Sequence, residues 1–145
     1  MNYDTTGIEL TEDSEALRLI AYPDPATLAD PWTIGYGHTG DDVYEGLVIT
    51  EDRAVELLHQ DIHFAEDAVK RLVTVELTQG QYDALVDFTF NVGVKNLEKS
   101  TLLYLVNAGK MAEADEQFER WVHAGGHILK GLVTRRYKEA RIFNA

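Results

Sequence analysis

The pattern of the sequence changes sharply near residue 50. All three prolines lie within residues 23–31, and β-branched, aromatic and glycine residues alternate over residues 32–39. From Thr50 onward apolar residues recur at helical spacing, first in the stripe Ala54, Leu58, Ile62, Ala65, Val69 and Leu72. Prolines end helices, whereas an apolar stripe with this period builds them. The change therefore predicts an α+β protein that is mostly helical, with a small β-hairpin lobe followed by a larger helical lobe.

The first third of the chain has sequence signals for one helix and a pair of strands. Apolar residues at helical spacing predict a helix over residues 10–21, with Thr11 as its N-cap and Glu15 inside it. We expect a short strand over residues 32–39 and a hairpin partner for it over residues 43–49.

The rest of the chain is expected to form a series of helices. Thr50 should cap a helix of about 20 residues that bridges the two lobes. Thr78 and Gln81 have the spacing of a capping box, which should open a helix that ends at Gly93. Further helices are expected over residues 101–106, 112–122 and 132–142. We expect the 145 residues to form one domain, with the N-terminal helix and β-rich lobe in residues 1–50 and the bridging helix and helical lobe in residues 51–145.

Charge and composition argue against several classes of protein. The chain has 25 acidic and 13 basic residues, a net charge of −12, and no cysteine. A strongly negative protein is repelled by phosphate backbones and by anionic membranes, so we expect no nucleic-acid partner and no stable membrane anchoring. Without cysteine there is no disulfide and no thiol nucleophile. The N-terminus has no basic segment followed by an apolar run, so we expect no secretory signal.

Three polar residues in the N-terminal third are candidate catalytic groups. Asp24 follows Glu15 by nine positions, and Thr33 follows Asp24 by nine. Two carboxyl groups in different environments are the minimum needed to cleave a glycosidic bond, and a hydroxyl can hold the attacking water. Acidic residues are abundant in this chain, however, so the spacing alone favours a solvated surface.

Several segments resemble, in the same order, those of one enzyme family. Residues 15–24 and 32–39 closely resemble the catalytic segment of phage-type lysozymes, the endolysins of the T4-lysozyme-like glycoside hydrolase family. Residues 81–93 resemble the central helix of that family. Four further segments resemble later parts of the family sequence: residues 100–103, 118–121, 124–126 and 131–136.

The resemblance implies a lysozyme-like bilobal fold with a cleft between the lobes. It also implies hydrolysis of the β-1,4 bond between N-acetylmuramic acid and N-acetylglucosamine in bacterial peptidoglycan, without cofactor or metal, which lyses the host cell. Glu15 would be the general acid, Asp24 would position the water or stabilise the oxocarbenium charge, and Thr33 would help to hold that water. His38 and Arg135 would support Glu15. Because Asp24 and Thr33 would be arranged around a water, we expect inversion at the anomeric carbon.

The sequence departs from the family pattern in two places. The family usually has Phe-Glu-Gly around the acid, whereas this chain has Ser14, Glu15 and Ala16. The loop over residues 24–32 is also longer than the shortest loops of the family by a few residues. These differences affect the expected geometry around Glu15 and between Asp24 and Thr33.

Two other functions stay open at this point. A lytic transglycosylase on a related fold needs one acidic residue and leaves a 1,6-anhydro sugar, and a catalytically silent glycan-binding module would keep the fold without the chemistry. His59, His63 and Asp67 share one helix face, which is a weak zinc signal. That helix is acidic and solvated, so we expect no metal site.

The family resemblance and the missing signal also lead to expectations about partners and location. The expected partner is the glycan strand of bacterial peptidoglycan, and we expect a monomer. We expect the protein to stay in the host bacterial cytoplasm until another protein permeabilises the membrane. It would then act on the cell wall in the periplasm.

Overall fold

The chain divides into two compact units, which we call the β-rich unit (residues 15–63) and the helical unit (residues 1–14 and 64–145). The structure, a computed structural model, describes residues 1–24 and 27–145. Residues 1–14 are thus grouped with the helices of residues 64–145. Helix α2 (Glu51–Leu72) begins in the β-rich unit and ends in the helical unit. That all 145 residues form one domain stays a prediction.

The β-rich unit contains a three-stranded antiparallel sheet in the order β1-β2-β3. Its strands are β1 (Arg18–Tyr22), β2 (Thr33–Gly35) and β3 (His38–Thr39). Arg18 is paired with Gly35, and Tyr22 with Thr33. A small core of Ala21, Ile34, Val43 and Leu57 lies beneath the sheet, with Trp32, Leu47 and Ile49 packed against it.

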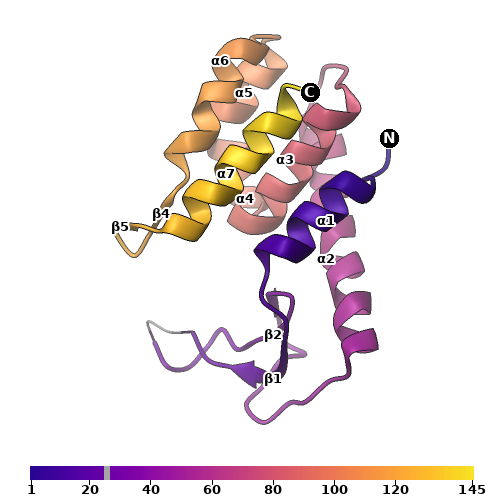
Figure 1. The fold of residues 1–145 in the computed structure, drawn as a ribbon, viewed down its shortest axis with the longest axis vertical. Coiled ribbons are helices and arrows are strands. Elements are labelled where there is room, and N and C mark those ends of the chain that lie inside the picture. The colour runs from indigo at the N-terminus through magenta and orange to yellow at the C-terminus, as the bar shows by residue number, and fades with distance from the viewer. Residues whose placement is uncertain (25–26) are drawn as a thin grey trace. The chain divides into compact units, whose positions relative to one another are not determined.

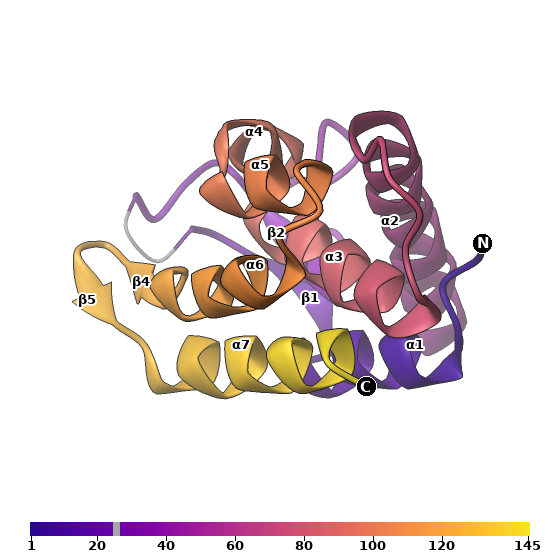
Figure 2. The same cartoon turned by 90° about the horizontal axis from the view of Figure 1, so that it is seen from above.

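The helical unit is built around α3 (Gln79–Val92), whose residues 82–89 are all buried. Helix α7 (Lys130–Phe143) packs along α3, and α1 (Thr5–Ser14) contacts both of these helices (Figures 1 and 2). The remaining elements are α4 (Val94–Lys99), α5 (Thr101–Asn107), α6 (Met111–Gln117), the 3₁₀ helix η1 (Phe118–Arg120), β4 (His123–Ala124) and β5 (His127–Ile128).

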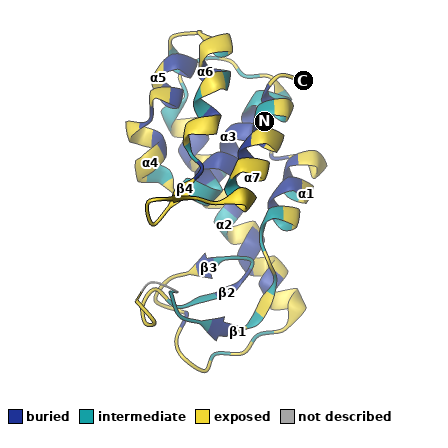
Figure 3. Cartoon of the chain, turned by 60° about the vertical axis from the view of Figure 1, so that its left-hand side comes forward, coloured by how far each residue is buried: buried dark blue, intermediate teal, exposed yellow. Residues whose placement is uncertain are grey.

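Aromatic rings join α3 to the C-terminal elements. Phe88 of α3 meets Phe118 and Trp121 edge-on, at ring-centre distances of 5.7 Å and 5.4 Å. Phe118 in turn contacts Phe143 of α7 at 5.4 Å. Figure 3 shows α3 as a largely buried helix, whereas the β4–β5 hairpin is exposed. The core of the helical unit therefore lies around α3.

Several expected helix boundaries are confirmed. Thr50 accepts a hydrogen bond from the Arg53 backbone at 3.1 Å and caps α2, which is 22 residues long. Thr78 and Gln81 form a complete capping box, and α3 ends at Gly93. Both caps are made within three residues, so the local sequence is enough to specify them. The helices expected over residues 101–106 and 132–142 are also present, as α5 and α7.

The expected helix over residues 10–21 is wrong. Helix α1 ends at Ser14, and residues 18–22 form strand β1. Burial along β1 follows strand alternation, with Ala21 buried and Ile20 63% exposed. Glu15 therefore lies between helix and strand. Thr11 is buried inside α1 and does not cap it.

Two further expectations need correction. Residues 43–49 do not pair with residues 32–39; Leu47 and Ile49 instead make backbone hydrogen bonds to β1. The segment 112–122 is not one helix, because α6 passes into η1 and the chain then turns into the β4–β5 hairpin. Gly125 and Gly126 form the tip of that hairpin with φ angles of +59° and +81°, a conformation that two-residue hairpin turns require.

Candidate active site

Glu15 packs against the turn between β2 and β3. A side chain on Gly37, at that turn, would begin only 2.9 Å from Glu15 Oε2. Gly37 also has a φ angle of +82°, which other residues rarely adopt. The turn therefore requires glycine for two reasons, and its missing side chain leaves space for the Glu15 carboxyl group.

Tyr22 lies near the same carboxyl group, and Arg18 packs on its ring. The Arg18 guanidinium sits 4.8 Å from the centre of the Tyr22 ring. Burial raises the pKa of Tyr22, and the negative charge of Glu15 raises it further, whereas Arg18 lowers it. The charge of Glu15 is thus close enough to affect residues on β1.

Asp24 and Thr33 lie toward the same end of the β1–β2 pair. Thr33 is directly opposite Tyr22, and Asp24 follows Tyr22 by two residues. The Asp24 backbone NH donates to the Ala29 carbonyl at 3.0 Å, and the Leu28 NH donates to the Asp24 carbonyl at 2.7 Å. Asp24 is therefore held by its own loop, and both side chains are half-buried. Part of this loop, residues 25–26, lies outside the described residues.

His38 is held between two carboxylates. Its Nδ1 lies 2.8 Å from Asp61 Oδ2 on α2, and its Nε2 lies 3.0 Å from Asp42 Oδ1. Both ring nitrogens therefore have carboxylate partners, and the support that His38 would give Glu15 stays a prediction. Since His38 directly follows Gly37, it anchors the strand whose turn packs on Glu15.

The two carboxylates make His38 a cation over a wider pH range than a free histidine. Burial alone lowers the pKa of His38, but hydrogen bonds to Asp61 and Asp42 outweigh burial and raise it above the ordinary value. The same bonds lower the pKa of Asp42, whereas burial raises that of Asp61. In its charged form, His38 thus joins β3 to α2 through Asp61.

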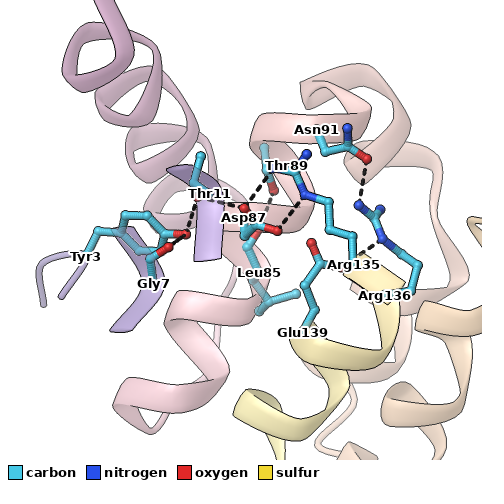
Figure 4. Close-up of polar contacts among 10 residues, drawn as sticks. All are labelled: Tyr3, Gly7, Thr11, Leu85, Asp87, Thr89, Asn91, Arg135, Arg136 and Glu139. Atoms are coloured by element: carbon cyan, nitrogen blue, oxygen red, sulfur yellow. Dashed lines mark hydrogen bonds and ion pairs between the residues drawn. The ribbon is translucent and has the colours of Figure 1, made fainter. Parts of the chain in front are cut away.

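Arg135 lies in the helical unit, where Asp87 holds it (Figure 4). Its Nε and Nη2 donate to the two carboxylate oxygens of Asp87, each at 2.9 Å. The Thr11 hydroxyl donates to Asp87 Oδ1 at 2.6 Å. Such two-point pairing fixes the plane of a guanidinium group. The role of Arg135 toward Glu15 stays a prediction.

Several of these partners were missed from the sequence. Asp61 looked like part of a solvated helix face, and nothing local marked it as the partner of His38. Asp87 had a usable signal, because it interrupts an apolar run of the helix expected to end at Gly93, and the structure buries it completely. A carboxylate in an apolar run needs a partner of opposite charge, and α7 supplies one in Arg135.

A depression in the surface of the helical unit contains Trp121. It has a volume of about 420 Å³, and its lining includes Asn91, Asn96, Trp121, His123 and Leu132. On its other side, Trp121 packs against Phe88 in the core of the helical unit. An indole beside two side-chain amides also provides the apolar and hydrogen-bonding surface that sugars or peptides bind.

The described residues, 1–24 and 27–145, contain no group of three or more side chains that could hold a metal ion. Within the same residues, no helix combines the length and apolar character needed to cross a bilayer.

Comparison with known proteins gives matches over almost the whole chain. The family model described as phage lysozyme matches residues 12–139. The chain is 43% identical to an endolysin of Bacillus phage B103 over 99% of its length, and 41% identical to an endolysin of Bacillus phage PZA over all of it. It covers 54% and 56% of those two proteins, about half of their length. A SAR-endolysin of Escherichia phage Mu is 43% identical over 88% of this chain and 74% of its own.

Solved structures agree with these matches. The muramidase domain of SpmX from Asticaccaulis excentricus has a TM-score of 0.89 at 36% identity, covering 99% of this chain and 98% of that one. A point mutant of P22 lysozyme has a TM-score of 0.81 at 35% identity, covering 100% of this chain and 99% of that one. The expected lysozyme-like, mostly helical α+β fold is therefore confirmed.

Proposed function

This chain belongs to the phage lysozyme family, and we propose that it acts as an endolysin, a muramidase. Its substrate is bacterial peptidoglycan, and the bond cleaved is the β-1,4 link between N-acetylmuramic acid and N-acetylglucosamine. Each cleavage leaves a new reducing end, and repeated cleavage of the glycan strands weakens the wall until the host cell lyses.

One observation carries this proposal: the Glu15 carboxyl group packs against Gly37 at the β2–β3 turn. A proton donor for glycoside cleavage has to be held at a fixed place, because general acid catalysis depends on reach to the leaving oxygen. The positive φ of Gly37 and the anchoring of His38 favour one geometry for this turn. Glu15 is therefore the group that we assign as the acid.

Asp24 and Thr33 supply the other half of the proposed reaction. Asp24 orients the attacking water or stabilises the oxocarbenium charge, and the Thr33 hydroxyl holds the same water. Their common end of the β1–β2 pair supports this pairing of roles. Attack by water on the face opposite the leaving group inverts the anomeric carbon. The chemistry requires only carboxyl groups and water, so EDTA should leave the rate unchanged.

We also propose that the protein acts as a monomer on the glycan strand and binds neither nucleic acid nor membrane stably. We place it in the host cytoplasm until a separate protein opens the membrane, after which it reaches the wall in the periplasm. Expression in a bacterium tests this location: cultures should stay turbid until chloroform permeabilises the membrane. Lysis without chloroform would contradict it.

The test of the function is Glu15→Gln, which keeps the shape of the side chain and removes the proton. We expect a loss of about 10²–10⁴-fold in the initial rate of turbidity loss on purified peptidoglycan. The matched control is Glu45→Gln, since Glu45 is exposed in the same unit. Circular dichroism should show both variants folded.

Mass spectrometry of the digested glycan separates the competing functions. Reducing ends support the hydrolase, whereas 1,6-anhydro ends would identify a lytic transglycosylase. Binding to peptidoglycan without new ends would identify a silent glycan-binding module. Undiminished cleavage by Glu15→Gln would reject Glu15 as the acid.

A further inference from the structure

A buried arginine holds one lining residue of the depression that contains Trp121, which we call the Trp121 depression. That residue is Asn91, and Arg136 Nη2 donates to Asn91 Oδ1 at 2.6 Å (Figure 4). The Arg136 side chain is 1% exposed, and its Nε lies 2.9 Å from Oε1 of the buried Glu139. Apolar side chains of similar size often replace a buried ion pair without loss of stability, so this pair calls for another explanation.

The bond from Arg136 decides which way the Asn91 carboxamide points. A guanidinium group has donors only, whereas a carboxamide has an oxygen that accepts and an NH2 group that donates. The oxygen of Asn91 therefore faces Arg136. Because the half-buried Asn91 side chain also lines the Trp121 depression, the NH2 group is the end that it offers there.

Asn96 is fixed in the opposite sense. Its Nδ2 donates to the Val92 carbonyl at 2.6 Å. A carbonyl oxygen only accepts, so the NH2 end of Asn96 faces the backbone and the side-chain oxygen is left for other partners. Asn96 lines the same depression. The Trp121 depression thus offers one donor, from Asn91, and one acceptor, from Asn96.

Trp121 supplies an apolar surface beside these two groups. Its ring meets Phe88 edge-on at a ring-centre distance of 5.4 Å, and the Arg136 guanidinium lies 5.2 Å from the centre of the same Phe88 ring. Phe88 is fully buried, and close packing in a core holds such a ring in place. Arg136 therefore supports Trp121 through Phe88 and contacts the Asn91 carboxamide directly.

A secondary amide matches this set of groups. Its C=O accepts a hydrogen bond and its N–H donates one, which complements the NH2 group of Asn91 and the oxygen of Asn96. An aromatic surface with a few placed polar groups is typical of ligand sites. The proposed substrate carries secondary amides in two places, in the N-acetyl groups of its sugars and in the peptide bonds of its stem peptides.

We propose that Arg136 is a positioning residue: it orients Asn91 so that the Trp121 depression binds a secondary amide between the Asn91 NH2 group and the Asn96 oxygen. The proposal rests on the proposed function for the identity of the substrate that carries this amide. All of these residues belong to the helical unit, so binding here is measured without reference to Glu15.

The main test is Asn91→Asp. Aspartate keeps an oxygen for Arg136 and replaces the NH2 group by a second oxygen, so the internal bond stays while the depression loses its donor. The dissociation constant for triacetylchitotriose, followed by the Trp121 indole N–H signal in an NMR titration, should rise about tenfold or more. The apparent KM for peptidoglycan should rise with little change in kcat.

The matched control is Asn144→Asp. It adds the same charge at an exposed position of the helical unit, outside the Trp121 depression. This variant should bind triacetylchitotriose and cleave peptidoglycan as the native protein does. Equal loss of binding in both variants would mean that charge alone weakens binding, which would overturn the proposal.

Three probes identify the group that is bound. Triacetylchitotriose carries acetamido groups, cellotriose has hydroxyl groups in their place, and a free stem peptide has peptide bonds without sugar. Shifts of the Asn91 NH2 signals by either amide-bearing probe, but not by cellotriose, support the proposal and show whether sugar or peptide supplies the amide. Equal shifts with cellotriose, or no shift with any probe, would overturn it.

The positioning role of Arg136 is tested by combining Arg136→Met with Glu139→Met. The double change removes both members of the buried pair, which proteins often tolerate, and leaves Asn91 in place. Binding of the probe should weaken about threefold or more, because an unheld carboxamide is only part of the time in the binding orientation. Unchanged binding would reject the role. If this variant does not fold, hydrogen exchange of the Arg136 Nη–H groups decides: protection in the native protein and in Asn91→Asp supports the role, and rapid exchange rejects it.

The outcomes separate this proposal from the proposed function. If the native protein binds an amide-bearing probe in the Trp121 depression but does not cleave peptidoglycan, the muramidase assignment fails and the amide site stands. If the native protein cleaves peptidoglycan and Asn91→Asp binds the probes equally well, the muramidase assignment stands and the amide site is rejected.

Discussion

Glu15 Oε2 lies 2.9 Å from the point at which a side chain on Gly37 would begin. Among the described residues, and apart from Gly37 and its two chain neighbours, no other heavy atom lies closer to that point. The proposed proton donor therefore packs against a glycine of the neighbouring hairpin turn. Its carboxyl group occupies space that the methyl group of an alanine at position 37 would need.

Gly37→Ala should displace Glu15 and reduce activity beyond any effect on stability. We expect a loss of about tenfold or more in the rate of peptidoglycan hydrolysis, because small displacements of catalytic groups are costly. The matched control is Gly46→Ala: Gly46 also has a positive φ, +89°, but apart from its chain neighbours no atom of residues 1–24 or 27–145 lies within 4 Å of its side-chain position. Both variants should lose about 1–2 kcal/mol of stability from the backbone conformation. Equal activity of the two variants would contradict the contact.

His38 should make stability depend on pH. Its pKa is raised in the folded protein, so its contribution is complete below the unfolded-state pKa of about 6.5 and is lost as pH rises through the folded-state pKa. The free energy of unfolding, measured with urea across this range, should therefore fall with rising pH. His38→Gln should remove this fall and cost about 1.5–3 kcal/mol at acidic pH.

The two partners of His38 should differ in their importance. The Asp61 side chain is 23% exposed and that of Asp42 is 53% exposed, so solvent screens the Asp42 pair more strongly. Asp61→Asn should therefore destabilise the protein more than Asp42→Asn below the pKa of His38. The reverse order would show that α2 does not anchor β3 in this way.

Asp83→Asn should stabilise the protein at alkaline pH. Burial and a hydrogen bond with Asp4 raise the pKa of Asp83 to about 7. The folded state therefore holds a proton that the unfolded state releases near pH 4, so stability falls as pH rises from about 4 to about 7. Asparagine keeps the oxygen that accepts from Gln79 at 2.8 Å and does not ionise. Thermal unfolding above pH 7 should show a higher Tm for the variant; a lower Tm would refute the prediction.

Ionic strength should have a two-phase effect on the rate. The net charge of −12 opposes approach to anionic cell-wall polymers. Salt at about 0.1 M screens charges beyond about 10 Å, so the rate should first rise with added NaCl and then fall. Initial rates on purified peptidoglycan across a salt series test this expectation. A steady decline from the lowest salt concentration would contradict it.

The stereochemistry of the first product should report the roles of Asp24 and Thr33. If these residues hold an attacking water, the new reducing end first appears as the α-anomer, which proton NMR detects before mutarotation. Thr33→Ala should slow the reaction without changing this outcome. A β-anomer would instead make Asp24 a nucleophile.

The sequence alone was enough where the determining interactions are local. The caps at Thr50 and Thr78 close within three residues, and the α2 stripe repeats every turn, so both appear in a short window. The candidates Glu15, Asp24 and Thr33 came from ordered segments resembling a family, and their roles stay predictions.

Tertiary structure decided what depends on distant partners. Residues 18–22 have spacing that also suits a helix, and they became a strand because residues 33–35 and 47–49 pair with them. His38 is 23 residues from Asp61, and Asp87 is 48 residues from Arg135, so no local pattern links them. Backbone caps and apolar periodicity depend on nearby residues, whereas a buried charge takes its partner from whichever element the fold packs beside it.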